Sequence, residues 1–121
     1  MEDLNINVLV GKTLASIKGE VGDEEMIFTT TDGEKYKLFH YQDCCESVSV
    51  EDICGDINDL VGSPIILSEE VSNYDAAPKE DEESFTWTFY RIQTAKGLVT
   101  IRWYGSSNGY YSESVSFEKI S

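Results

Sequence analysis

The sequence has no long apolar run, few basic residues and a single histidine. No apolar stretch approaches the roughly 20 residues of a transmembrane helix, which predicts that no membrane span is present. The opening residues, 1–5, lack the basic start and the apolar stretch of a signal peptide. We therefore expect a cytoplasmic protein.

The cysteines do not have the pattern of a secreted disulfide framework. Cys44, Cys45 and Cys54 are an odd number, and two of them are adjacent. Secreted frameworks usually contain an even number, and neighbouring cysteines rarely pair with each other because the ring is strained. The sequence predicts reduced thiols in a reducing compartment.

Positive charge is scarce. There are 23 acidic and 9 basic residues, a formal net charge of −14. Such a field repels phosphate backbones and anionic lipids, so we expect no direct nucleic-acid binding and no membrane binding. It attracts a basic protein surface, and could imitate a nucleic acid toward a protein that binds one. The alternative is that the charge serves only solubility.

Catalytic motifs are absent. One histidine does not establish a Ser-His-Asp arrangement, although Cys44 or Cys45 with His40 is conceivable. The chain has no phosphate-binding glycine-rich loop and no His-Glu-x-x-His motif. Carboxylates are so abundant that no chosen pair is informative. The sequence predicts a non-enzyme without a cofactor.

The aromatic content and the 121-residue length predict one packed domain over 1–121. Residues 8–18 should form a turn or short helix that enters a strand. Two β-rich runs, 26–31 and 34–40, flank Asp32-Gly33, which suits a two-residue type I′ hairpin turn. In that register Ile27 faces the core.

Further strands are expected over 64–71, 85–92, 98–104 and 114–120. Ala95-Lys96-Gly97 should connect the second and third of these as a hairpin. Apolar residues alternate with polar ones, and the following should face the core: Phe85, Trp87 and Phe89; Val99, Ile101 and Trp103; Val115 and Phe117.

An amphipathic helix is predicted over 50–61, with Ser49 as its N-cap and Gly62 after its end. Its apolar stripe consists of Val50, Ile53, Cys54, Ile57, Leu60 and Val61. The opposite side would present an acidic partner face of Glu51, Asp52, Asp56 and Asp59. Together these elements predict an α+β domain, with one main α-helix packed on an antiparallel meander of about six strands.

The segment 102–113 has the composition of a contact surface. It combines aromatic rings, a guanidinium and hydroxyls around the Asn108-Gly109 turn. The candidate ligand or partner contacts are Arg102, Trp103, Tyr104, Asn108, Tyr110, Tyr111 and Glu113. Strand alternation places Arg102 and Tyr104 opposite Trp103, on the less buried face. The alternative is that these rings only fill the sheet.

A second candidate site is a metal site at the end of the predicted hairpin. His40, Asp43, Cys44 and Cys45 have donor atoms that suit zinc. Their spacing is poor, because adjacent cysteines point in different directions and no Cys-x-x-Cys motif is present. A turn with one buried cysteine is the alternative.

Five blocks resemble a family of small phage and prophage proteins known only as a domain of unknown function. They are His40–Glu46, Glu51–Asp56, Gly62–Ile66, Thr86–Tyr90 and Arg102–Glu113. The resemblance extends from Gly11 onward and implies a phage context, hence the host-cell cytoplasm. It implies no catalytic or ligand-binding residues.

Small acidic phage proteins of this size often inhibit bacterial defence. One hypothesis is that the acidic partner face, together with the acidic loop 75–83, binds a basic cleft of a host protein. The alternative is that a homo-oligomer sequesters a small nucleotide through Arg102 and the nearby rings. A structural or virion-associated role is the third hypothesis.

Overall fold

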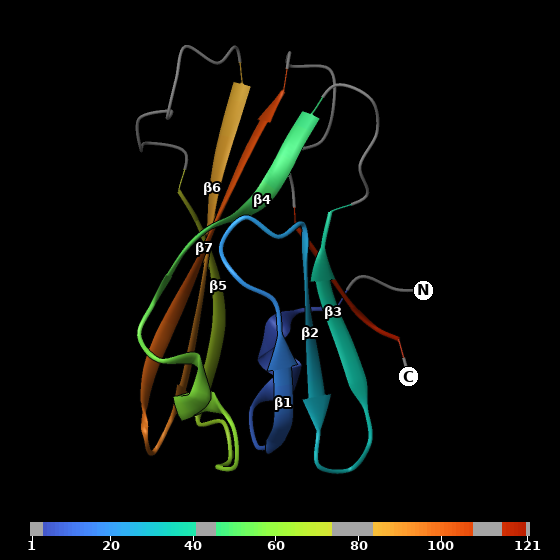
Figure 1. Cartoon of the computed structure of the whole chain (residues 1–121), viewed down its shortest axis with the longest axis vertical. Helices are drawn as coiled ribbons and strands as arrows, with labels where there is room; N and C mark the ends of the chain where they lie inside the picture. Colours follow the sequence, from blue (N-terminus) through green and yellow to red (C-terminus); the bar gives the residue numbers. More distant parts are fainter. Residues whose placement is uncertain (1–3, 41–45, 74–83, 108–114, 121) are drawn as a thin grey trace.

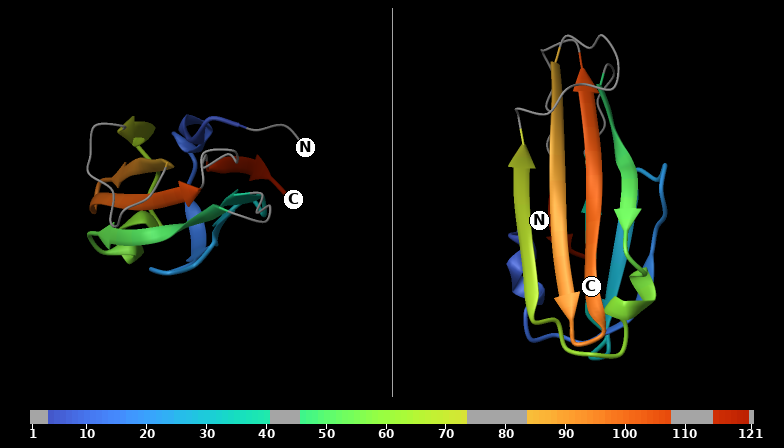
Figure 2. Two further views of the ribbon diagram at one scale, coloured as in Figure 1. Left: turned by 90° about the horizontal axis from the view of Figure 1, so that it is seen from above. Right: turned by 90° about the vertical axis from the view of Figure 1, so that its left-hand side faces the viewer.

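The computed structural model describes residues 4–40, 46–73, 84–107 and 115–120. These residues form a sandwich of two four-stranded antiparallel sheets, with strand orders β1-β2-β3-β8 and β4-β7-β6-β5 (Figures 1 and 2). The elements are 3-10 helix η1 (Ile6–Leu9), β1 (Leu14–Lys18), β2 (Glu25–Thr30), β3 (Lys35–Phe39), β4 (Glu46–Cys54), 3-10 helix η2 (Ile57–Leu60), β5 (Leu67–Asn73), β6 (Ser84–Thr94), β7 (Gly97–Ser107) and β8 (Ser116–Lys119). None of the helices in these ranges is long or apolar enough to cross a membrane.

The α-helix predicted over 50–61 is wrong, and with it the α+β assignment. Strand β4 occupies most of that range, followed by the single turn η2. The register shifts between Val50 and Asp52, so that Val50 and Ile53 pair with the core-facing residues of β7. A β-bulge thus produces the three-residue apolar spacing that indicated a helix. Cys54, expected to be buried, is exposed.

The hairpin of β2 and β3 is confirmed, but its turn differs from the prediction. Gly33 N donates to Thr30 O at 3.1 Å, and Thr30 N donates to Glu34 O at 2.8 Å. Within this turn only Gly33 has a positive φ, +89°. The loop therefore has three residues, and the extra residue shifts the register by one. The core-facing residue is Phe28, not Ile27.

The long hairpin of β6 and β7 is also confirmed, with Thr94 opposite Gly97. Val99, Ile101 and Trp103 of β7 are buried as expected, as are Val115 and Phe117 beside and in β8. The expected face of β6 is wrong: its core side carries Thr88, Tyr90 and Ile92. Directly paired residues share a face, and Phe89 pairs with Arg102 while Trp87 pairs with Tyr104. Both aromatic residues therefore lie on the side away from the core.

The two sheets are joined by backbone hydrogen bonds along one side, which we call the seam. Gly22 N donates to Val50 O at 2.8 Å, and Val50 N donates to Asp23 O at 2.9 Å. Farther along, Gly62 N donates to Leu14 O at 2.9 Å. Figure 1 shows the blue β1–β2 connection beside the green β4 at the first of these contacts.

Candidate contact surfaces

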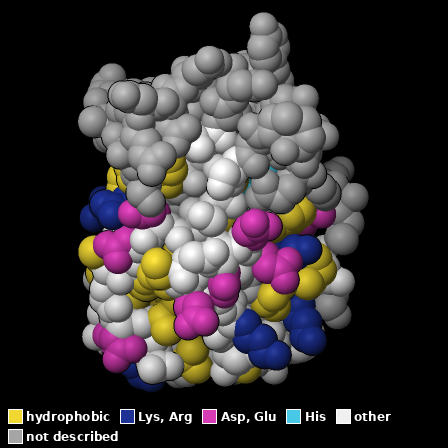
Figure 3. Space-filling view, turned by 45° about the horizontal axis from the view of Figure 1, so that its top comes forward, with side chains coloured by type: hydrophobic (Ala, Val, Ile, Leu, Met, Phe, Trp, Pro, Cys, Tyr) yellow, Lys and Arg dark blue, Asp and Glu magenta, His cyan; other side chains and the backbone are white. Residues whose placement is uncertain are grey.

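The seam brings together two acidic segments that are far apart in the sequence. The β1–β2 connection and the start of β2 supply four carboxylates, and Glu51 follows the hydrogen-bonded Val50 on β4. We define the acidic seam as Glu20, Asp23, Glu24, Glu25 and Glu51. Figure 3 shows acidic side chains across the described part of one face of the molecule, with basic side chains toward its margins. Four of these five carboxylates come from the segment 20–25, and the fold places that segment beside the β4 strand that carries Glu51.

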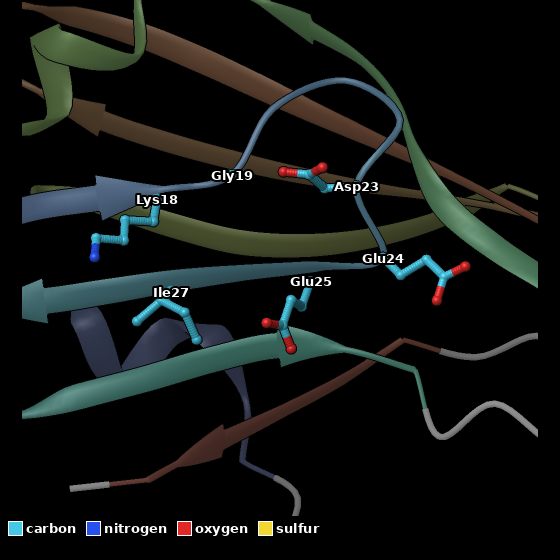
Figure 4. Close-up of a pocket in the computed structure, with 6 residues that line it drawn as sticks. All are labelled: Lys18, Gly19, Asp23, Glu24, Glu25 and Ile27. Atoms are coloured by element: carbon cyan, nitrogen blue, oxygen red, sulfur yellow. The ribbon is translucent and has the colours of Figure 1, made fainter.

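A hollow of about 300 Å³ lies at the acidic seam (Figure 4). Its lining comes from the end of β1, the connection and the start of β2: Lys18, Gly19, Asp23, Glu24, Glu25 and Ile27. Gly19 has φ +136°, and a Cβ there would lie 2.6 Å from Met26 Cγ, so the turn requires glycine. Three carboxylates and one ammonium line this hollow, so its lining is net acidic.

Most of the carboxylates in the connection are available for a partner. Glu25 pairs with Lys37 at 3.1 Å across β2 and β3. Asp23 Oδ2 accepts a hydrogen bond from Glu20 N at 2.9 Å, which shapes the turn. Glu20, Asp23 and Glu24 have no ion-pair partner within the described ranges. Among all the residues that the structure describes, no group of three or more His, Cys, Asp or Glu side chains could hold a metal ion.

The predicted acidic partner face does not exist as one helix face. Asp52 lies 3.8 Å from Arg102, and Asp56 caps η2 by accepting from Asn58 N at 2.9 Å. Asp59 packs against Gly97, where an added Cβ would be 2.8 Å from its Oδ2. Only Glu51 of this set belongs to the acidic seam. The carboxylates that the sequence reasoning missed are in 20–25, four acids in six residues, and that density was the available signal.

A second surface is the side of β4-β7-β6-β5 that points away from the core, which we call the outer face (Figure 2, right). The Arg102 guanidinium lies 5.1 Å from the Trp87 ring and 3.8 Å from the nearer Asp52 oxygen. The Tyr104 ring is 4.4 Å from that of Trp87, at 56°. These contacts fix the guanidinium, while Arg102 Nε has no hydrogen-bond partner within the described ranges.

Register arranges the exposed part of the outer face in two adjacent rows. The first row runs Asp52, Arg102, Phe89, Val71 across the four strands, and the second runs Cys54, Thr100, Arg91, Glu69. Arg91 pairs with Glu69 at 3.2 Å. Each arginine therefore has a carboxylate beside it, and these two rows carry no net charge.

The predicted contact residues of 102–113 lie in different environments. Arg102 and Tyr104 are on the outer face, opposite Trp103, as strand alternation predicted. Trp103 is 0% exposed in the core and has no surface for a ligand, and Tyr104 is only 8% exposed. The others (Asn108, Tyr110, Tyr111 and Glu113) lie outside the described residues.

The metal site remains a prediction. His40 is buried at the end of β3. Asp43, Cys44 and Cys45 lie outside the described residues. The exposed Cys54 thiol contacts Asp52 Oδ2 at 3.6 Å and is on the outer face, in the sheet opposite that of His40.

Residues 7–117 match a family model described as a domain of unknown function, DUF7448. The chain belongs to the DUF7448 family. This confirms the resemblance to a domain of unknown function that extends over nearly the whole sequence. The DUF7448 match includes both the acidic seam and the outer face, so each surface is part of the family domain. No curated protein and no solved structure matches the chain.

Proposed function

We propose that this chain is a non-catalytic binding protein whose acidic seam engages a basic surface of a partner protein. The observation that supports the proposal is the pair of backbone hydrogen bonds between residues 22–23 and Val50, by which the acidic segment 20–25 lies beside the β4 strand that carries Glu51. Three carboxylates of the connection have no ion-pair partner within the described ranges, although Asp23 accepts a backbone hydrogen bond. A lysine or arginine side chain of a partner would enter the adjoining hollow.

The overall charge supports the same partner class. A net charge of −14 steers a basic protein toward the chain over long range and repels nucleic acid and anionic membrane. In the acidic seam, Glu20, Asp23 and Glu24 have no ion-pair partner within the described ranges, whereas Glu25 pairs with Lys37. A role in solubility would explain the net charge. It would not explain why the carboxylates of the acidic seam lie together beside a hollow.

We further propose that the partner is a host factor in the host-cell cytoplasm, which the chain inhibits by occupying a basic cleft. The resemblance to phage and prophage proteins supports this context. Inhibition by occupancy needs neither a cofactor nor a catalytic group, in agreement with the lack of catalytic motifs in the sequence.

A fluorescent decalysine peptide tests the charge-binding step, with binding followed by anisotropy. The seam variant Glu20→Gln/Glu24→Gln is compared with Asp32→Asn/Glu70→Gln, which removes two negative charges elsewhere. All four side chains are exposed. The seam variant should bind the peptide at least severalfold more weakly than its matched control, and salt should weaken binding. Equal affinities of the two variants would show that the peptide responds to the net charge of the chain and not to the acidic seam.

A small nucleotide is the second candidate ligand, and the observation that favours it is the partly exposed Arg102 guanidinium beside the Trp87 ring. The ligand phosphate would be bound by a guanidinium that Trp87 and Asp52 already hold in place. Native mass spectrometry of the protein as isolated tests this candidate. A bound mass that Arg102→Ala removes and Glu24→Gln retains would favour it over the acidic seam.

A further inference from the structure

The exposed rows of the outer face are balanced in charge, in a chain that is strongly acidic as a whole. Its exposed rows contain two arginines and two carboxylates, all between 39% and 47% exposed at the side chain. The chain as a whole has a net charge of −14. Two copies repel each other as whole molecules, but the two rows of one copy would add no net repulsion against the same rows of the other.

The composition of the outer face is that of a protein interface. Val71 is 44% exposed and Leu98 is 40% exposed, and both belong to this face together with the half-buried Phe89. Aromatic residues and arginine are enriched in protein interfaces, whereas unpaired acidic residues are depleted. A partly apolar surface whose charges are already paired has the composition expected of a surface that is buried against another protein.

The area of the face is sufficient for a dimer. Strands β6 and β7 have 11 residues each, β4 has 9 and β5 has 7. At about 3.3 Å per residue and about 4.8 Å between strands, one face has an area on the order of 600 Å². Two such faces would bury on the order of 1,200 Å², the lower end of the range for specific interfaces.

We propose that the outer face is a docking surface for a second copy of this chain. A two-fold axis parallel to the strands, between β6 and β7, would place Arg102 of each copy over Phe89 of the other. The same operation places Arg91 over Thr100. No like charges meet in this arrangement, and both Arg–carboxylate pairs remain intact.

Sedimentation equilibrium of the full chain, from about 1 to 100 µM, tests the proposal. Twice the monomer mass is expected at the upper end. Because salt screens the repulsion between acidic copies, added salt should strengthen dimerisation. That direction is opposite to the one expected for peptide binding at the acidic seam, so failure of one proposal is distinguishable from failure of the other.

Leu98→Asp is the variant that targets the interface, and Ile120→Asp is its control. Their side chains are similarly exposed, 40% and 38%, and the charge change is the same. Leu98→Asp should weaken dimerisation at least about tenfold, since it adds an unpaired charge to the buried area. Ile120→Asp should dimerise like the wild type, and circular dichroism checks that both fold.

A wild-type chain that stays monomeric at 100 µM in high salt would overturn the proposal. So would a folded Leu98→Asp chain that dimerises as tightly as Ile120→Asp. Val71→Asp is a second interface variant, on strand β5 at the edge of the outer face. If this variant folds and dimerises as tightly as the wild type, the proposal is also overturned.

Discussion

Val50 N donates a hydrogen bond to Asp23 O at 2.9 Å, and this bond joins strand β4 of one sheet to the β1–β2 connection of the other. Val50 is buried in the core, whereas Asp23 belongs to the hollow at the surface. The contact therefore connects the packing of the sandwich to the placement of the acidic seam. Substitutions in the β1–β2 connection should therefore alter both the free energy of unfolding and the positions of the carboxylates in the acidic seam.

The Asp23 side chain should stabilise the connection by hydrogen bonding, not by charge. Its Oδ2 accepts from Glu20 N at 2.9 Å. Asp23→Ala removes the acceptor and should lower the free energy of unfolding by about 1 kcal/mol. Asp23→Asn loses the same charge and keeps an acceptor oxygen, so its stability should stay close to that of the wild type. Urea denaturation of the three proteins measures the difference, and equal losses in both variants would contradict the assignment.

Glu34 should make stability depend on pH in the acid range. Hydrogen bonds from Lys12 and Lys119, at 2.9 and 3.0 Å, lower the pKa of Glu34 from 4.5 to about 2. A lowered folded-state pKa stabilises the protein above the unfolded pKa and loses that contribution as the pH falls toward 2. Urea unfolding of wild type and Glu34→Gln between pH 2 and 7 should therefore differ most near neutrality and converge near pH 2. A difference that does not change with pH would contradict the ion-pair assignment.

Gly55 should tolerate substitution less well than Gly33. Both have positive φ, +107° and +89°. A Cβ at Gly55 would lie 2.7 Å from Leu98 O, whereas nothing lies within 4 Å of one at Gly33. Gly33→Ala should cost about 1 kcal/mol through backbone strain alone, and Gly55→Ala more than that. Thermal unfolding of the two variants measures which substitution lowers the melting temperature more. A larger loss in Gly33→Ala than in Gly55→Ala would contradict the structure.

Cys54 should react readily with a thiol reagent in the folded protein. It is exposed at the end of β4. The helix predicted over 50–61 would instead have buried it. Native Cys44→Ser/Cys45→Ser protein should therefore be modified by a colorimetric disulfide reagent at a rate close to that of the urea-unfolded protein. Protection of the thiol until unfolding would favour the helical arrangement over the strand.

Local sequence signals predicted the hairpins but not the sandwich. Asp32-Gly33 and Ala95-Lys96-Gly97 mark the positions of both turns because turn chemistry is local, although the first loop has three residues and not the predicted two. The spacing of Val50 and Ile53 is ambiguous between a helix and a bulged strand, and the pairing with β7 resolves it only in three dimensions. The core side of β6 likewise depends on its register with β7.

The candidate surfaces depended even more on tertiary structure. Alternation correctly placed Arg102 on the outer face of β7, but the contact with Trp87 comes from a neighbouring strand. The acidic seam needs long-range hydrogen bonds between 22–23 and Val50, which no local pattern specifies. The density of acids in 20–25 was visible in the sequence, whereas their position beside β4 was not.

The most direct test of the central claim is the decalysine titration of the two charge-matched double variants at low salt. The account predicts that Glu20→Gln/Glu24→Gln binds at least severalfold more weakly than Asp32→Asn/Glu70→Gln, and that the gap narrows as salt rises. Indistinguishable affinities at every salt concentration would show that the seam is not a specific contact surface.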